Sequence, residues 1–232
     1  MGTDHKLVLW DIDHTLIETG GVGSEVFGEA FHEVTGVRMK DMASVAGRTE
    51  PVIFRETLDM HHVTSSDGLF ERFADAQARG YERRADEMRV RGRVLPGAIA
   101  ALQTLARQSG ITQSVLTGNT RKSAQVKLRA FGLDSFLDLD IGAYGEDDPV
   151  RAHLVSIAQQ RAHRQRKHTY SADSTVLIGD TPQDVAAARE GGARIIAVAS
   201  GSSSAAELKD AGADIVFPDL IDSSALIRAL AV

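Results

Sequence analysis

Short apolar runs recur along this chain of 232 residues, and each ends at a polar or glycine-rich turn before a helical pattern begins. These runs predict strands at residues 6–10, 112–116, 137–143, 175–178, 194–199 and 214–217. The intervening stretches favour helices at residues 98–109, 120–131, 150–163, 182–190, 204–210 and 222–230. Apolar strands that alternate with helices indicate a parallel sheet covered on both faces. With right-handed crossovers, the prediction is a doubly wound, Rossmann-like α/β fold.

Residues 17–95 interrupt this alternation, because they contain no convincing buried strand. Their pattern predicts three helices, near residues 23–35, 50–61 and 66–90. Glycines at both ends of the segment, among them Gly20 and Gly92, permit hinge motion at low steric cost. We therefore expect an α/β core domain of residues 1–16 and 96–232, with an all-helical domain of residues 17–95 inserted after the first strand.

Composition excludes several classes of function. The chain contains no cysteine, which excludes thiol nucleophiles, iron–sulfur clusters, zinc ribbons and a disulfide scaffold. Its formal net charge of -6 argues against a nucleic-acid partner attracted by bulk charge. The first apolar run is too short for a signal peptide or a membrane span, so we expect a cytoplasmic protein without a membrane partner. The oligomeric state cannot be predicted from these features.

Polar residues, most of them with carboxylate or hydroxyl side chains, follow the ends of three predicted strands. They are Asp11 and Asp13, then Thr117 with Gly118 and Asn119, and finally Asp180 with Asp184. Ligands of an open α/β sheet bind beyond the carboxyl ends of its strands, so these groups should converge on one edge. Several carboxylates held together need a cation, and hard oxygen ligands suit Mg²⁺. Each Asp alone could equally cap a helix or a turn, as Asp184 would after Thr181.

The pair formed by Asp11 and Asp13 suits phosphoryl transfer. A carboxylate kept ionised by a divalent cation can attack phosphorus, and its neighbour can handle the proton of the leaving oxygen. Thr117 offers a hydroxyl for phosphate oxygens, and backbone N–H groups follow it at Gly118 and Asn119, where a helix is predicted to start.

Three motifs resemble those of the haloacid dehalogenase (HAD) superfamily and occur in the same order. WDIDHTL is similar to the first motif, DxDxT, VLTGN to the second, and LIGDTPQDVAAA to the fourth, GDxxxD. The resemblance implies that Asp11 is the nucleophile, that Asp13 is the general acid and then the general base, and that Thr117 binds the transferring phosphoryl group. It places Mg²⁺ among Asp11, Asp13, Asp180 and Asp184. There Asp13 would contribute its backbone carbonyl, and Asp184 would position Asp180 or a metal-bound water.

The third motif of the family is a lysine, and here the sequence departs from the pattern. No lysine lies between Lys127 and Lys167. Arg151, at a predicted helix start, is the expected substitute, because a guanidinium can contact both Asp11 and a phosphate. Two alternatives stay open: a solvated Arg151 on a helix face, or a role for Lys122.

Residues 17–95 resemble the family's helical cap of the C1 type, which closes over the site and selects substrates. Within them, AGRTEP resembles the GRT loop of phosphoglycolate-phosphatase-like members. We therefore expect Arg48 and Thr49 to contact the substrate from the cap, and Gly118 and Asn119 to contact it from the core. Alternatively, Thr49 only caps a helix.

Together these features predict a Mg²⁺-dependent phosphomonoesterase that hydrolyses a small phosphorylated metabolite through an aspartyl-phosphate on Asp11. A sugar-phosphate mutase of the same superfamily is the enzymatic alternative. A catalytically weak member that binds a phosphorylated ligand or a protein is the alternative from another class. Asp13 argues against haloacid dehalogenation, which needs no leaving-group acid. Phosphoglycolate, sugar phosphates, nucleotide monophosphates and pyrophosphate all stay open as substrates.

Overall fold

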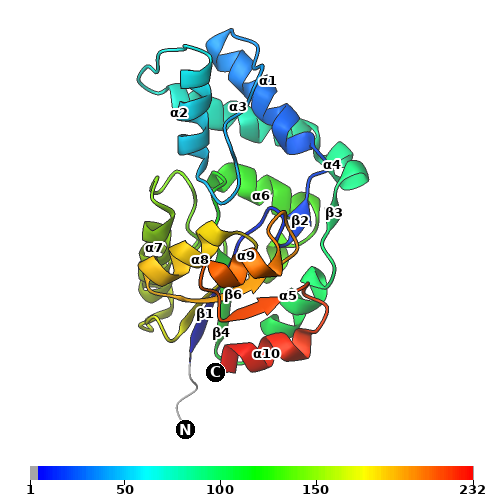
Figure 1. The fold of residues 1–232 in the computed structure, drawn as a ribbon, viewed down its shortest axis with the longest axis vertical. Coiled ribbons are helices and arrows are strands. Elements are labelled where there is room, and N and C mark those ends of the chain that lie inside the picture. The colour runs from blue at the N-terminus through cyan, green and yellow to red at the C-terminus, as the bar shows by residue number, and fades with distance from the viewer. Residues whose placement is uncertain (1–4, 232) are drawn as a thin grey trace.

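A parallel sheet forms the core of the computed structural model, which describes residues 5–231 (Figure 1). Its five strands lie in the order β4-β1-β5-β6-β7. Their bounds are β1 (Lys6–Trp10), β4 (Ile111–Val115), β5 (Thr175–Gly179), β6 (Arg194–Val198) and β7 (Ile215–Phe217). Every neighbouring pair in this sheet is parallel, which confirms the predicted doubly wound α/β fold.

Helices cover both faces of the sheet. One face carries α5 (Ala98–Ala106), α6 (Arg121–Ala130) and α10 (Ser223–Ala231), and the other carries α7 (Arg151–Arg166), α8 (Pro182–Gly191) and α9 (Ala205–Asp210). Both faces need this cover because side chains alternate along each strand. In β1, Val8 and Trp10 pack on the first face, whereas Leu7 and Leu9 pack on the second. None of the helices described between residues 5 and 231 is long and apolar enough to span a membrane.

The predicted strand at residues 137–143 is wrong. A short 3-10 turn, η1 (Asp134–Phe136), leads into this segment, and Ala143 alone forms an isolated bridge next to the end of β4. The side chain of Asp138 accepts the N–H of Asp140 at 3.2 Å. Such a local side-chain bond competes with the strand ladder, and the apolar pattern of the segment did not reveal it.

Residues 17–95 are here called the cap segment, and their helices form a bundle in the upper part of Figure 1. The helices are α1 (Val22–Thr35), α2 (Glu50–Met60), α3 (Leu69–Arg83) and α4 (Ala85–Arg91). The single helix predicted at residues 66–90 is wrong, because the chain leaves helical geometry at Arg84 between α3 and α4. Aromatic rings fill the bundle, and the rings of Phe54 and Phe73 stack with centroids 4.2 Å apart.

A two-stranded ribbon joins the cap segment to the core. Strands β2 (Ile17–Glu18) and β3 (Arg93–Val94) pair antiparallel, and the N–H of Leu95 donates to the carbonyl of Leu16 at 2.9 Å. This ribbon is absent from the sequence-based expectation, since two residues are too few to show a strand pattern. The ribbon lies where the chain passes from the core into the cap segment, at residues 16 and 17, and back again, at residues 95 and 96. The division into domains at these points stays a prediction.

Candidate active site

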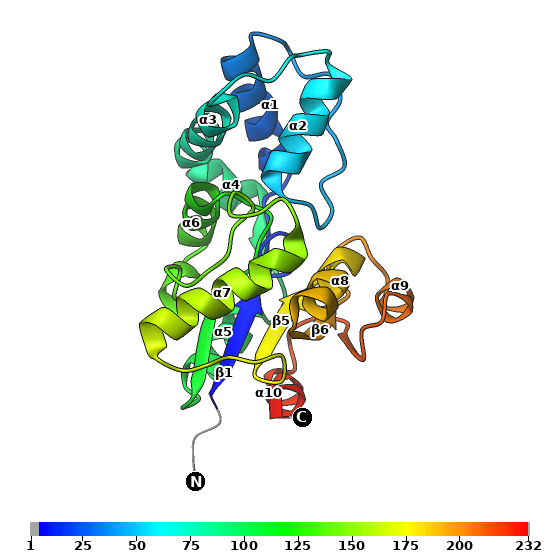
Figure 2. The ribbon, with the colours of Figure 1, turned by 90° about the vertical axis from the view of Figure 1, so that its left-hand side faces the viewer.

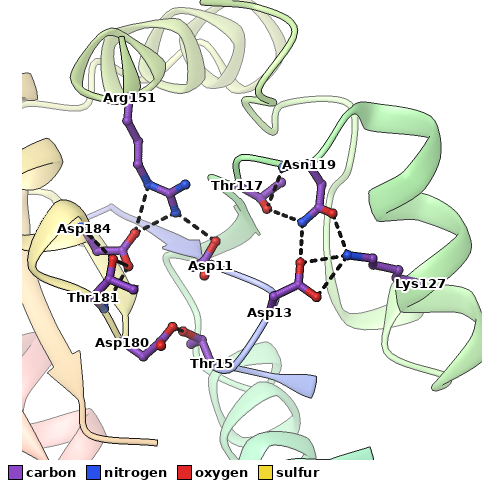
Figure 3. Close-up of polar contacts among 10 residues, drawn as sticks. All are labelled: Asp11, Asp13, Thr15, Thr117, Asn119, Lys127, Arg151, Asp180, Thr181 and Asp184. Atoms are coloured by element: carbon purple, nitrogen blue, oxygen red, sulfur yellow. Dashed lines mark hydrogen bonds and ion pairs between the residues drawn. The ribbon is translucent and has the colours of Figure 1, made fainter. Parts of the chain in front are cut away.

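The polar groups predicted to converge follow three adjacent strands. Asp11 follows β1, Thr117 follows β4 and Asp180 follows β5, and β1 lies between the other two strands. The three side chains line one cavity of about 500 Å³, whose opposite wall belongs to the cap segment. Asp11 therefore lies between Thr117 and Asp180 at the carboxyl edge of the sheet (Figure 3).

Three buried carboxylates form a cluster at this edge. Asp11, Asp180 and Asp184 each place one oxygen within 4.8 Å of the others. Thr15, from the first motif, donates its hydroxyl to Asp180 at 2.8 Å. Oδ2 of Asp184 accepts the N–H of Thr181 at 3.1 Å, and the N–H of Asp184 donates to the hydroxyl oxygen of Thr181 at 3.2 Å, which forms a capping box at the start of α8. The prediction that Asp184 occupies the first turn of this helix is confirmed.

Burial and mutual repulsion disfavour three negative charges here. Burial raises the pKa of Asp11 well above its usual range, the Arg151 charge opposes this rise, and the other carboxylates add to it. Burial, with the charge of Asp184, also raises the pKa of Asp180 to about 6. A divalent cation would stabilise the ionised set, and Mg²⁺ usually binds one or two protein carboxylates. The donor set thus fits Mg²⁺.

Arg151 begins α7 and extends into the site (Figure 3). Its Nη2 atom lies 2.9 Å from Oδ1 of Asp11 and 2.7 Å from Oδ1 of Asp184. The side chain is 8% exposed, so the alternative of a solvated Arg151 is wrong. Lys122 is exposed and pairs with Asp75 of the cap segment, away from these carboxylates.

Asp13 contacts a buried lysine that the sequence analysis did not assign to the site. Lys127 on α6 donates from Nζ to the two carboxylate oxygens of Asp13, at 3.0 and 2.8 Å, and to Oδ1 of Asn119 at 2.7 Å. Asn119 donates from Nδ2 to Asp13 at 2.7 Å and to the hydroxyl of Thr117 at 2.8 Å. Asn119 thus orients two candidate catalytic groups, and its direct contact with substrate stays a prediction.

The charge of Lys127 determines the state of Asp13. Burial alone would raise the pKa of Asp13, but Lys127 and the bond from Asn119 outweigh it and set that pKa below its usual range. Burial would likewise lower the pKa of Lys127, but Asp13, Tyr81 and Glu50 raise it above its usual range. The sequence carried little signal for this role, because Ser123, one turn earlier on the same buried face of the helix, is also polar.

The loop before α2 brings the cap segment to the core. The N–H of Glu50 donates to the carbonyl of Gly118 at 2.8 Å. A Cβ atom at Gly118 would lie 2.0 Å from the carbonyl oxygen of Arg48, so only glycine permits this approach. Arg48 lines the cavity and its guanidinium pairs with Glu56, while its contact with a substrate stays a prediction. Glu50 also lines the cavity, although the sequence analysis did not select it.

Thr49 occupies the N-cap position of α2 but makes no side-chain capping bond. Its hydroxyl donates to the carbonyl of Pro149 at 3.3 Å, and the residue is 2% exposed. The side chain therefore ties the cap segment to the backbone just before α7. Contact between Thr49 and a substrate stays a prediction.

The remaining cavity wall comes from the cap segment and is largely apolar. Its apolar members are Phe27, Met42, Val45 and Ile53, and its polar members include Gln77 and Tyr81. A ligand in the cavity thus meets charged groups of the core on one side, and on the other side apolar side chains together with Arg48 and Glu50.

Solved structures share this architecture. A hydrolase from Pseudomonas syringae superposes with a TM-score of 0.70 at 21% identity, covering 98% of this chain and 100% of that chain. A predicted phosphoglycolate phosphatase from Haemophilus somnus 129PT superposes with a TM-score of 0.69 at 19% identity, covering 97% and 99%. At these identities the likeness shows the fold.

Sequence comparison defines the family. The chain is 32% identical over 125 residues to the probable phosphatase IndB of Dickeya dadantii. That match spans 54% of this chain and 52% of IndB, so the aligned part is about half of the relative's length. The family model for haloacid dehalogenase-like hydrolases matches residues 8–189, which contain every residue of the candidate active site discussed above. With that match over most of its length, and with the three motifs at one edge of the sheet, the chain belongs to the haloacid dehalogenase-like hydrolases.

Proposed function

We propose that this protein is a Mg²⁺-dependent phosphomonoesterase that hydrolyses a small phosphorylated metabolite through an aspartyl-phosphate on Asp11. One observation carries the proposal. Asp11 lies 2.9 Å from the guanidinium of Arg151, in the same cavity as Asp13, and the two carboxylates are held by different cations. A nucleophile and a separate acid–base group are what hydrolysis through a covalent intermediate requires. The similarity to a probable phosphatase supports the same activity.

In this proposal, Asp11 and Asp180 hold Mg²⁺ together with the backbone carbonyl of Asp13, and Asp184 positions the ligands. Both oxygens of Asp184 already accept bonds, one from Arg151 and one from Thr181, which suits a positioning role. When bound, the ion would offset the repulsion among the carboxylates and the negative charge of the phosphate.

The side chains of this protein would carry the two half-reactions. The pKa of Asp13 lies below its usual range, so this carboxylate takes up a proton from the arriving phosphate monoester. An oxygen of Asp11 then attacks phosphorus, and the bond from phosphorus to the leaving oxygen breaks as Asp13 gives that oxygen this proton. Asp13 then accepts a proton from water, whose oxygen attacks phosphorus and releases inorganic phosphate and the free carboxylate of Asp11. Thr117, the N–H of Gly118 and Arg151 bind the phosphoryl oxygens, whose charge distribution changes in each transition state.

The cap segment would exclude bulk water and select the leaving group. Its wall of the cavity combines apolar side chains with Glu50, whose pKa is raised by burial. Exclusion of water strengthens the electrostatic interactions of Arg151 and Asp11 with the phosphate.

Phosphate release from 4-nitrophenyl phosphate and from a panel of phosphometabolites tests the proposal. We expect release with Mg²⁺, none with EDTA, and none from the Asp11→Asn variant. Asp67→Asn, an exchange of the same kind at an exposed position of the cap segment, should match the wild type. Phosphate release without a sugar bisphosphate would separate hydrolysis from mutase activity. Unchanged hydrolysis by Asp11→Asn would exclude the nucleophile proposed here.

A further inference from the structure

The cap segment packs on the core through buried polar side chains of two helices. Gln77 and Tyr81 lie one turn apart on α3, and Ser123 and Lys127 lie one turn apart on α6. All four are at most 4% exposed. The hydroxyl of Ser123 donates to the side-chain oxygen of Gln77 at 3.2 Å, and Nζ of Lys127 lies 4.9 Å from the centre of the Tyr81 ring. Figures 1 and 2 both show α6 directly beside the cap helices.

Lys127 stands at the end of this interface where the catalytic carboxylates begin. Its ammonium donates to both oxygens of Asp13 and to Asn119, which uses the three N–H bonds that a lysine offers (Figure 3). The ring of Tyr81 covers it from the cap segment, where a cation over an aromatic face is stabilised. A buried ammonium needs such partners on every side, and here the core and the cap segment each supply a part.

Resting on the proposed function, we propose that Lys127 is a positioning residue that fixes the carboxylate of Asp13 while α3 of the cap segment is docked on α6. Two hydrogen bonds from one ammonium hold both oxygens of that carboxylate. The ion pair is strong because Tyr81 shields it from water, and it weakens when α3 separates and water enters. Asp13 is thus held in position for proton transfer when the cavity is closed, whereas Arg151 holds Asp11.

Two phosphate esters of similar size separate this role from a general loss of structure. Benzyl phosphate loses an alkoxide that needs the proton of Asp13, whereas 4-nitrophenyl phosphate loses a stable anion. Lys127→Met leaves Asp13 able to bind a proton but removes the contacts that fix it. We expect kcat/KM to fall by about 100-fold for benzyl phosphate and by less than about tenfold for 4-nitrophenyl phosphate. An unchanged or raised value for benzyl phosphate, or equal losses for both esters, overturns the inference.

Lys122→Met is the matched control, because Lys122 lies on the same helix and also pairs with a carboxylate, Asp75 of the cap segment, but at an exposed position. It should leave both esters unaffected, and the melting temperature of each variant reports whether it folds. If wild-type protein hydrolyses neither ester, the proposed function fails and the inference with it. If the wild type hydrolyses both but Lys127→Met lacks the expected selectivity, the inference alone fails.

A double-mutant cycle tests whether Lys127 acts through Asp13. In an Asp13→Asn background, Lys127→Met should cause no further loss with benzyl phosphate, because its target is already gone. Additive losses would overturn the inference. Tyr81→Leu removes the ring over the ammonium and should cause a smaller loss with the same selectivity. This variant carries the test should Lys127→Met not fold, and a Tyr81→Leu protein with the selectivity of the wild type would refute the role of the cap segment.

Discussion

At the scale of single residues, two buried cations divide the work between two carboxylates. Arg151 contacts Asp11 and Asp184, whereas Lys127 contacts Asp13. Sequence reasoning predicted Arg151, because the motif pattern calls for a cation in that stretch. It missed Lys127, because a lysine in a helix is ordinarily solvated, and only the packing of α6 beneath the cap segment buries this one.

Replacement of Arg151 by Ala should lower turnover of 4-nitrophenyl phosphate by about 10²–10³-fold, since it removes a donor directed at the reacting phosphoryl group. The variant should also melt at a lower temperature, because Asp11 and Asp184 lose their buried counter-charge. Arg164→Ala, at an exposed position of the same helix, is the control for both measurements. Near-normal turnover in Arg151→Ala would refute the role assigned to this side chain.

At the scale of elements, the sequence predicted the core strands that position the site and failed where the pattern was short or local. The apolar runs ending at Asp11, Thr117 and Asp180 are strands, because a sheet buried on both faces demands continuous apolar residues. The segment at residues 137–143 alternates apolar residues with Asp138 and Asp140 and runs beside β4 without a ladder. The break at Arg84 was not visible because helical propensity continues across it.

The close contact between the loop at Gly118 and the loop before α2 leads to a prediction at this scale. Gly118→Ala would place a methyl group 2.0 Å from the carbonyl oxygen of Arg48, so the loop before α2 must move away. We expect a lower kcat/KM with a correctly folded core, measured on 4-nitrophenyl phosphate beside a melting curve. Gly28→Ala, within α1, is the control, because its added methyl group meets only the flexible end of Met39. Equal activity in the two variants would show that this approach is not needed for catalysis.

At the scale of the whole molecule, the catalytic edge of the core is encoded by three local motifs, whereas the cap segment offers only the loop at residues 46–51. The residues that complete the cavity, such as Phe27, Glu50 and Tyr81, come from three different helices. No spacing in the sequence relates them, and only the packing of the bundle brings them together. The chemistry of the core could therefore be predicted from the sequence, whereas the shape and polarity of the substrate cavity could not.

Mg²⁺ should stabilise the whole molecule, because the repulsion among Asp11, Asp180 and Asp184 is present only in the folded chain. At a concentration of 100 times its Kd, the ion should add about 2.7 kcal/mol to the free energy of unfolding, seen as a higher melting temperature that EDTA reverses. NaCl at matched ionic strength controls for screening, and Asp180→Asn should abolish most of the effect.

The stabilisation by Mg²⁺ should depend on pH with a defined sign. The pKa of Asp180 in the folded protein without the ion is raised from 3.8 to about 6. Protons therefore compete with Mg²⁺ as the pH falls through about 6, and the rise in melting temperature should shrink there. Without the ion, the contribution of Asp180 to the free energy of unfolding changes with pH in the opposite direction. Its raised pKa makes the folded state bind the proton more tightly, so its contribution to stability is largest below pH 3.8 and is lost as the pH rises through about 6. A Mg²⁺-induced shift that is the same at pH 5 and pH 8, or the same in Asp180→Asn, would refute the metal site proposed here.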